Sequence, residues 1–169
     1  MKKIAIAILL VLFPLTALAI PPEPMVFTAK SVKGNKKKIA DGIEKTISDM
    51  SFITKPIARG KLEDSNLAFR KISITVNDGK VSIQHDARKP VVSPVDGGKV
   101  KWVREDGESF QISQKVGEQK ITQIFYAESG KKTLVYKFDK EFNQLWVSVR
   151  LDSPKLDLPL RYTMSYKKN

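Results

Sequence analysis

Hydrophobic residues follow a helical period in one early part of the chain. Ile39, Ile43, Ile47 and Met50 recur at spacings of four, four and three, which places them on a single helical face. Pro56 interrupts this pattern, so the helix is expected to end by about Lys55. Asn35 or Asp41 could cap its start. The pattern therefore predicts one amphipathic helix over residues 39–55.

Beyond Pro56 the hydrophobic period changes from 3.6 to 2, which is typical of strands. The alternating segments are separated by turn signals such as Asn77-Asp78-Gly79-Lys80. They cover residues 70–76, 81–85, 100–103, 110–112, 121–126, 134–138, 145–149 and 160–166. Short turns favour antiparallel pairing of neighbours. The expected fold is mainly β, an up-and-down antiparallel barrel of about eight strands with the helix packed on it, although a sandwich would give the same pattern.

The N-terminus has the features of a secretory signal peptide. Lys2 and Lys3 precede the apolar run Ile4–Phe13, and Ala17-Leu18-Ala19 matches the small-x-small cleavage pattern. We therefore divide the chain into a signal peptide (1–19), an extended proline-rich and basic segment (20–38) that could include a short strand at 25–29, and one β-barrel domain (39–169) that includes the helix. The location is expected to be periplasmic or secreted, with no transmembrane segment after cleavage.

Charge and cysteine content narrow the range of partners. The formal charge is +12, and loss of Lys2 and Lys3 leaves 28 basic against 18 acidic side chains, or +10. This favours anionic partners such as a membrane surface or an acidic protein, and export makes nucleic acid an unsuitable partner. Lys33, Lys36, Lys37 and Lys38 form the densest basic segment and are the candidate anionic-surface site. The chain has no cysteine, so disulfides and thiolate metal sites are excluded.

The residues for catalysis are sparse. His85 is the only histidine, and no nucleophile, zinc or phosphate-binding motif is present. A carboxylate-dependent hydrolase is the alternative, but acids such as Asp78, Asp96 and Asp106 lie in turns, where aspartate usually bonds its own backbone. We predict a protein that is not an enzyme and that has no metal or cofactor.

Alternation along the strands identifies five candidate ligand-binding residues: His85, Trp102, Arg104, Tyr136 and Tyr162. His85 shares a face with Val81 and Ile83, and its alternative is a position at the rim, where its strand ends. Arg104 shares a face with Val100 and Trp102. An inward Arg104 would need an anionic partner and would indicate a bound acid, whereas a position at the rim would not. The alternative for the two tyrosines is a place in the core, where aromatic stripes are found more often than at ligand contacts.

A strand, a helix and a closed antiparallel meander resemble the calycin barrels, the lipocalins and fatty-acid-binding proteins. That resemblance implies a barrel around an apolar ligand. The chain lacks the lipocalin Gly-x-Trp signature, and its adjacent Arg161 and Tyr162 cannot form the Arg-x-Tyr pair of fatty-acid-binding proteins. Residues 134–167 also resemble exported bacterial proteins of unknown function. Two functions follow as alternatives: a carrier of an apolar or amphipathic anionic ligand such as a lipid or fatty acid, or a solid barrel that binds an acidic partner through its basic surface.

Overall fold

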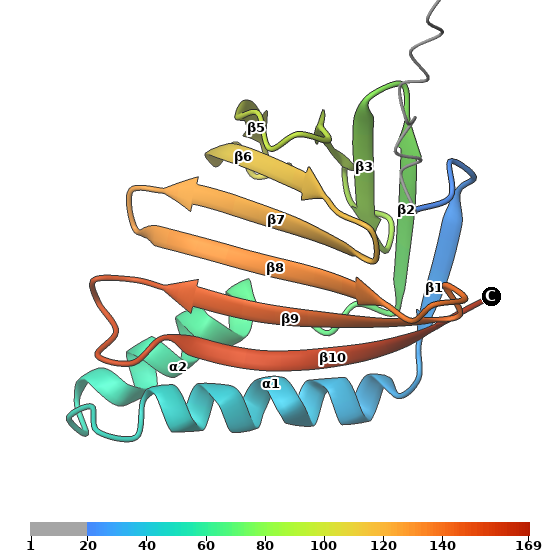
Figure 1. The fold of residues 1–169 in the computed structure, drawn as a ribbon. Coiled ribbons are helices and arrows are strands. Elements are labelled where there is room, and N and C mark those ends of the chain that lie inside the picture. The colour runs from blue at the N-terminus through green and yellow to red at the C-terminus, as the bar shows by residue number, and fades with distance from the viewer. Residues whose placement is uncertain (1–19) are drawn as a thin grey trace, which may run out of the picture.

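The computed structural model describes residues 20–169, and one antiparallel sheet with two helices makes up its regular structure (Figure 1). The predicted signal peptide, residues 1–19, lies outside the described residues. The helices are α1 (Val32–Thr46) and α2 (Thr54–Ser65). The strands are β1 (Met25–Ala29), β2 (Lys71–Asn77), β3 (Lys80–His85), β4 (Val91–Pro94), β5 (Val100–Val103), β6 (Ser109–Val116), β7 (Lys120–Ala127), β8 (Gly130–Phe138), β9 (Gln144–Asp152) and β10 (Leu160–Lys168).

The strands form a nearly closed barrel in the order β4-β3-β2-β1-β10-β9-β8-β7-β6-β5. Strand β1 pairs with both β2 and β10, so it joins strands β2–β4 to the rest of the sheet. Strands β2 and β3 run across the direction of β7–β10 (Figure 1). The open seam lies between β4 and β5. It is bridged where the amide of Val116 donates to the carbonyl of Val95 at 2.8 Å and where Asp96 pairs with Lys115.

The predicted mainly-β, up-and-down barrel is confirmed, but its sheet has ten strands rather than eight. Strand β4 is short and ends in Pro94, so it lacks the alternating run by which the other strands are recognised. Strand β1 was expected as a short strand before the barrel domain. It is part of the barrel itself, because the sheet is continuous only through its pairing with β2 and β10.

The predicted helix start at residue 39 is wrong, because α1 begins at Val32, inside the segment expected to be extended. Ser31 caps the helix, and its Oγ accepts a hydrogen bond from the Gly34 amide at 2.9 Å. With this cap, Lys36, Lys37 and Lys38 lie beyond the first turn. They therefore avoid the turn in which the helix dipole repels cations most strongly. The basic run is therefore compatible with helix.

The single predicted helix is in fact two, because α1 ends at Thr46 and α2 begins at Thr54. Pro56 lies in the first turn of α2, where a proline removes no intrahelical hydrogen bond. Leu62 is the one buried residue of α2, whereas the neighbouring Phe52, Ile53 and Ile57 are exposed. With so little buried surface, α2 has no clear helical stripe, and this is why the sequence pattern missed it.

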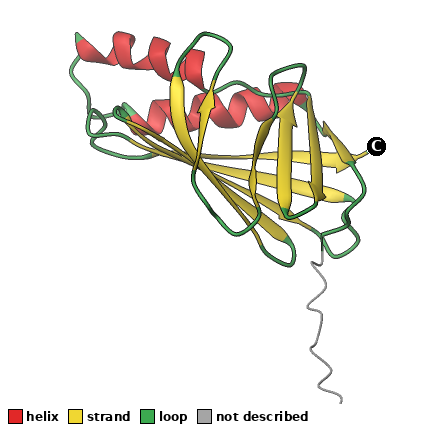
Figure 2. Ribbon diagram, turned by 90° about the horizontal axis from the view of Figure 1, so that it is seen from above, coloured by secondary structure: helices red, strands yellow, loops and turns green. Residues whose placement is uncertain are grey.

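Helix α1 runs along β10 where that strand has no partner from β1 (Figures 1 and 2). The expected contact face is confirmed for Ile39, Ile43 and Ile47, which are buried in the main core, while Met50 follows the helix and packs at the edge of the core. The side-chain amide of Asn35 bonds both backbone groups of Ser165, at 3.1 and 3.4 Å, and so takes the place of a neighbouring strand.

The close approach of α1 to β10 requires glycine at position 42. A β-carbon at Gly42 would lie 2.7 Å from the carbonyl oxygen of Arg161, whereas one at Gly60 in α2 would meet nothing within 4 Å. We expect Gly42→Ala to lower the free energy of unfolding by about 1–3 kcal/mol. Gly60→Ala should raise it by about 0.5–1 kcal/mol, because alanine favours helix. Urea melts of both variants test this, and equal stabilities would contradict the docking of α1.

The barrel is solid at the end where β1 meets β10. Phe27 and Phe138 are buried with ring centroids 5.7 Å apart, and Phe142 packs on Phe138 at 5.4 Å. Tyr166, Met164 and Leu145 fill the space beside them as part of the same core. The opposite end, nearer to α2, is the hollow one. Within residues 20–169, neither helix has the length and apolar character that crossing a membrane requires.

Candidate functional site

A cavity of about 860 Å³ occupies the hollow end of the barrel, between α2, the turn before it, and the strands opposite. Its apolar wall includes Trp102 of β5, Phe110 of β6 and Phe125 of β7, whose ring centroids lie about 6 Å from one another in tilted and edge-to-face pairs. Phe69, Leu134 and Leu151 extend this surface. The cavity can therefore hold an apolar group of considerable size, since typical ligand cavities measure about 300–1,000 Å³.

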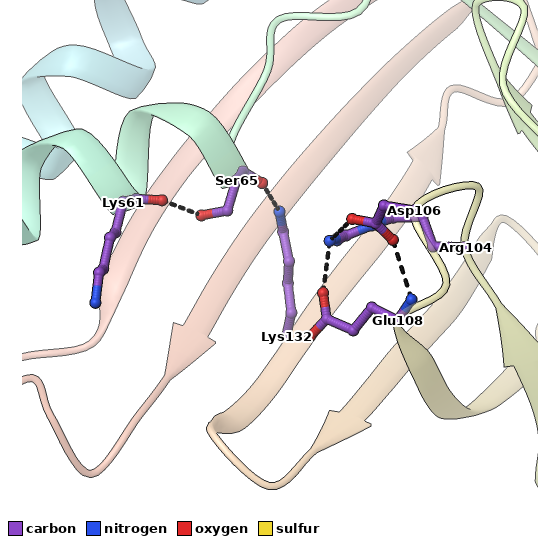
Figure 3. Close-up of polar contacts among 6 residues, drawn as sticks. All are labelled: Lys61, Ser65, Arg104, Asp106, Glu108 and Lys132. Atoms are coloured by element: carbon purple, nitrogen blue, oxygen red, sulfur yellow. Dashed lines mark hydrogen bonds and ion pairs between the residues drawn. The ribbon is translucent and has the colours of Figure 1, made fainter.

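Lys132 of β8 places a cation inside this cavity. Its ammonium donates to the carbonyl of Ser65 at 2.9 Å, at the C-terminal end of α2, where the helix dipole favours positive charge (Figure 3). Burial, with the neighbouring Arg104 and Arg88 acting in the same direction, lowers the pKa of Lys132 to about 8. No carboxylate within residues 20–169 forms an ion pair with Lys132.

Arg104 also lines the cavity, but carboxylates of its own loop neutralise it. Its Nε lies 3.0 and 2.9 Å from the two oxygens of Asp106, and its guanidinium also bonds Glu108 (Figure 3). The bond from Arg104 lowers the pKa of Asp106 to about 2. The anionic partner expected for an inward Arg104 is therefore supplied by the chain, so the position of this side chain does not in itself require a bound acid.

His85 lies at the inner end of the cavity and belongs to a buried row of hydrogen bonds. Its Nε2 is 2.9 Å from the hydroxyl of Tyr136, which donates to Oε1 of Gln123 at 2.8 Å. Gln114, paired with Gln123 in the sheet, accepts from Ser93 at 2.7 Å. We call these five residues the polar row. Burial, with Lys132 and Arg88 nearby, lowers the pKa of His85 to about 3, so its imidazole is neutral at ordinary pH.

The lowered pKa of His85 predicts a loss of stability in acid. The unfolded chain takes up the proton at about pH 6.5 and the folded protein only at about pH 3, so stability falls as the pH drops through this interval. Between pH 7 and pH 5 the expected loss from this residue is about 2 kcal/mol. Urea melts at both pH values measure it. The variant His85→Phe should lose distinctly less, and the same loss in both proteins would disprove the assignment.

The other predicted ligand residues lie outside the cavity lining. Tyr162 is buried beneath α2, and its hydroxyl donates to Asn66 at 3.0 Å. Tyr136 lies behind His85, in the polar row. Of the five candidates, His85, Trp102 and Arg104 line the cavity, whereas Tyr136 and Tyr162 support residues beside it.

The candidate anionic-surface lysines Lys33, Lys36, Lys37 and Lys38 are exposed on the first half of α1, and none of them lines the cavity. Lys37 pairs with Asp41 at 2.8 Å. In the part of the chain that the structure describes, no group of three or more histidine and acidic residues is arranged to hold a metal ion.

Lys132 and Phe69 are cavity residues that sequence reasoning missed, although a signal for Lys132 was present. Leu134, Tyr136 and Phe138 alternate inward along β8, so the same alternation extended by two residues places Lys132 on the inner face. Phe69 had no such signal. It lies before β2, and it is positioned by stacking on His85 with centroids 4.4 Å apart.

Comparison with solved structures identifies the fold. A fatty-acid-binding protein from brain tissue of Drosophila melanogaster superposes with a TM-score of 0.51 over 86% of this chain and 96% of its own, at 11% sequence identity. Fatty-acid-binding protein 1 of Echinococcus granulosus gives 0.50 over 85% and 94%, at 15% identity. No family model and no curated protein sequence matches the chain. The fold is therefore a calycin-like barrel with the architecture of these fatty-acid-binding proteins.

Proposed function

We propose that this protein is a non-enzymatic carrier that holds an amphipathic anionic ligand, such as a fatty acid, in the hollow end of its barrel. The apolar chain lies against the Trp102, Phe110 and Phe125 wall, and the acid group pairs with Lys132. The observation that carries this proposal is the Lys132 ammonium itself, a cation in an aromatic-lined cavity with no carboxylate partner in the described part of the chain.

Two further observations support the proposal. Cations outnumber acids around the cavity even when Arg104 and its partner Glu108 are left out: Lys61, Arg88, Lys89, Lys132 and Lys155 against Asp49, Glu105 and Asp157. This excess draws in an anionic head group. The two fold neighbours described above are both fatty-acid-binding proteins by name.

The proposed place of action is outside the cytoplasm, as a periplasmic or secreted protein. This part of the proposal rests on Lys2, Lys3, the apolar run Ile4–Phe13 and the Ala17-Leu18-Ala19 site. Edman sequencing of the exported protein should begin at Ile20, and a chain that keeps Met1 would contradict export with cleavage.

Titration of a fluorescent fatty acid into delipidated protein tests the carrier function. We expect saturable binding with one site, weakened by raised salt because charge attraction contributes. Lys36→Gln, on the exposed face of α1, serves as the control cation, since Lys36 does not line the cavity, and it should change the affinity little. An absence of saturable binding, with thermal unfolding unaffected by added fatty acid, would overturn the proposal and favour the alternative of a barrel that meets an acidic partner.

A further inference from the structure

The proton arrangement in the polar row fixes what His85 can offer a ligand. A tyrosine hydroxyl has one proton, and that of Tyr136 goes to Oε1 of Gln123 at 2.8 Å. The Gln123 amide is oriented with Oε1 toward Tyr136 and with its own Nε2 unpartnered within residues 20–169. With the amide in this orientation, the 2.9 Å contact between Tyr136 and His85 uses a proton from the histidine, so Nε2 of His85 carries the hydrogen and donates. In a neutral imidazole the second nitrogen, Nδ1, then has no hydrogen and is an acceptor.

The acceptor nitrogen is available to the cavity. His85 lines the cavity, its Nε2 is held by the buried Tyr136, and Nδ1 has no hydrogen-bond partner within residues 20–169. Stacking on Phe69, with ring planes 19° apart, fixes the imidazole in this orientation. Burial opposes protonation of the ring most strongly, and the nearby Lys132 and Arg88 act in the same direction, so Nδ1 remains an acceptor at neutral pH.

We propose that the ligand carries a hydroxyl group on its apolar chain and that this hydroxyl donates a hydrogen bond to Nδ1 of His85. The inference rests on the carrier function proposed above and narrows its ligand class from fatty acids in general to hydroxylated acyl chains. The acid group lies at Lys132 on β8 and the hydroxyl lies at His85 on β3, across the cavity. A ketone at the same carbon has no proton to donate and faces the lone pair of Nδ1, so the site selects against it.

The tautomer can be measured before any ligand is added. His85 is the only histidine of the chain, so its two ring nitrogens give an unambiguous 15N spectrum. We expect the shifts of a neutral ring protonated at Nε2. A spectrum of the Nδ1-protonated form would overturn the inference regardless of any ligand result.

Ligand selectivity is then measured by calorimetry with octadecanoic acid, hydroxyoctadecanoic acids with the hydroxyl at successive carbons, and their oxo analogues. At the carbon that reaches His85, the hydroxy acid should bind about fivefold or more tightly than the oxo acid. If octadecanoic acid binds but no hydroxy acid exceeds its oxo analogue, the carrier function stands and this inference fails. If none of these acids binds, both fail.

The variant Gln123→Leu reverses the proton arrangement and provides the sharpest test. Without Oε1 of Gln123, the Tyr136 proton turns to Nε2 of His85, and Nδ1 takes the hydrogen and becomes a donor. The preference for the hydroxy acid should then disappear, because a hydroxyl and an oxo oxygen can both accept from the Nδ1 hydrogen, and the 15N spectrum should change with it. Gln111→Leu, at an exposed position of the neighbouring β6, is the control and should keep the original preference. An unchanged preference in Gln123→Leu would contradict the inference.

Discussion

Lys132→Met is expected to lower the affinity for a long-chain fatty acid about tenfold or more and to leave the affinity for the corresponding fatty alcohol within about twofold. A hydrogen-bonded pair with a charged group contributes about 1.5–3 kcal/mol, which corresponds to this loss. Methionine keeps the length and apolar stem of lysine, so the cavity wall is preserved. Calorimetric titration of both ligands into both proteins gives the comparison.

The comparison of acid with alcohol separates ligand binding from a purely structural role of Lys132. The ammonium also bonds the end of α2 through Ser65, so its loss loosens the contact between this helix and the barrel. A looser α2 would weaken acid and alcohol alike, whereas loss of the ion pair weakens the acid alone. An equal effect on the two ligands would show that Lys132 acts only as a helix cap.

A pH series provides a second check on the same ion pair. The pKa of Lys132 is about 8 before the ligand binds, so the ammonium is charged below that pH and loses its charge above it. A bound carboxylate stabilises the charged form, so affinity for the acid should fall as the pH rises above about 8. Arg88 and Arg104 face the same cavity but remain charged throughout, and the alcohol should show no such dependence.

Phe138→Ala is expected to lower the free energy of unfolding by about 3–5 kcal/mol, the usual cost of removing a fully packed aromatic ring. Phe138 is 1% exposed and lies between Phe27 and Phe142 in the solid end of the barrel. Phe125→Ala should cost distinctly less, because Phe125 is partly exposed in the cavity wall and its removal enlarges an existing space. Urea melts compare the two variants, and equal losses would contradict a barrel that is solid at one end and hollow at the other.

The strands were predictable because each buries one face, which imposes the period of two on the sequence. Ile72, Ile74 and Val76 are buried together in β2, as their alternation predicted. The same logic failed where an element is short or buries few residues. Helix α2 buries Leu62 alone, and β4 contains four residues with a proline at its end. Short elements of this kind are positioned by the sheet around them and leave little signal in their own sequence.

The candidate site was predictable in its wall but not in its chemistry. Alternation put Trp102 on an inward face and left His85 and Arg104 open between an inward position and the rim; all three line the cavity. The partners that decide their roles come from distant positions: Tyr136 holds His85, and Asp106 and Glu108 neutralise Arg104. Whether a barrel is hollow depends on how several layers of side chains fill it together. Here the aromatic residues fill one end and line the space at the other.

The most direct test of a carrier barrel is to locate the fatty acid chain inside it by NMR. In a complex of the delipidated protein with 13C-labelled octadecanoic acid, we predict nuclear Overhauser contacts from the chain methylenes to Trp102, Phe110, Phe125 and Leu134. We also predict contacts from the carbon next to the carboxylate to the side chain of Lys132, and none to Phe27 or Phe138 in the solid end. Contacts confined to the exposed lysines of α1, or an absence of contacts to the cavity wall, would contradict the account.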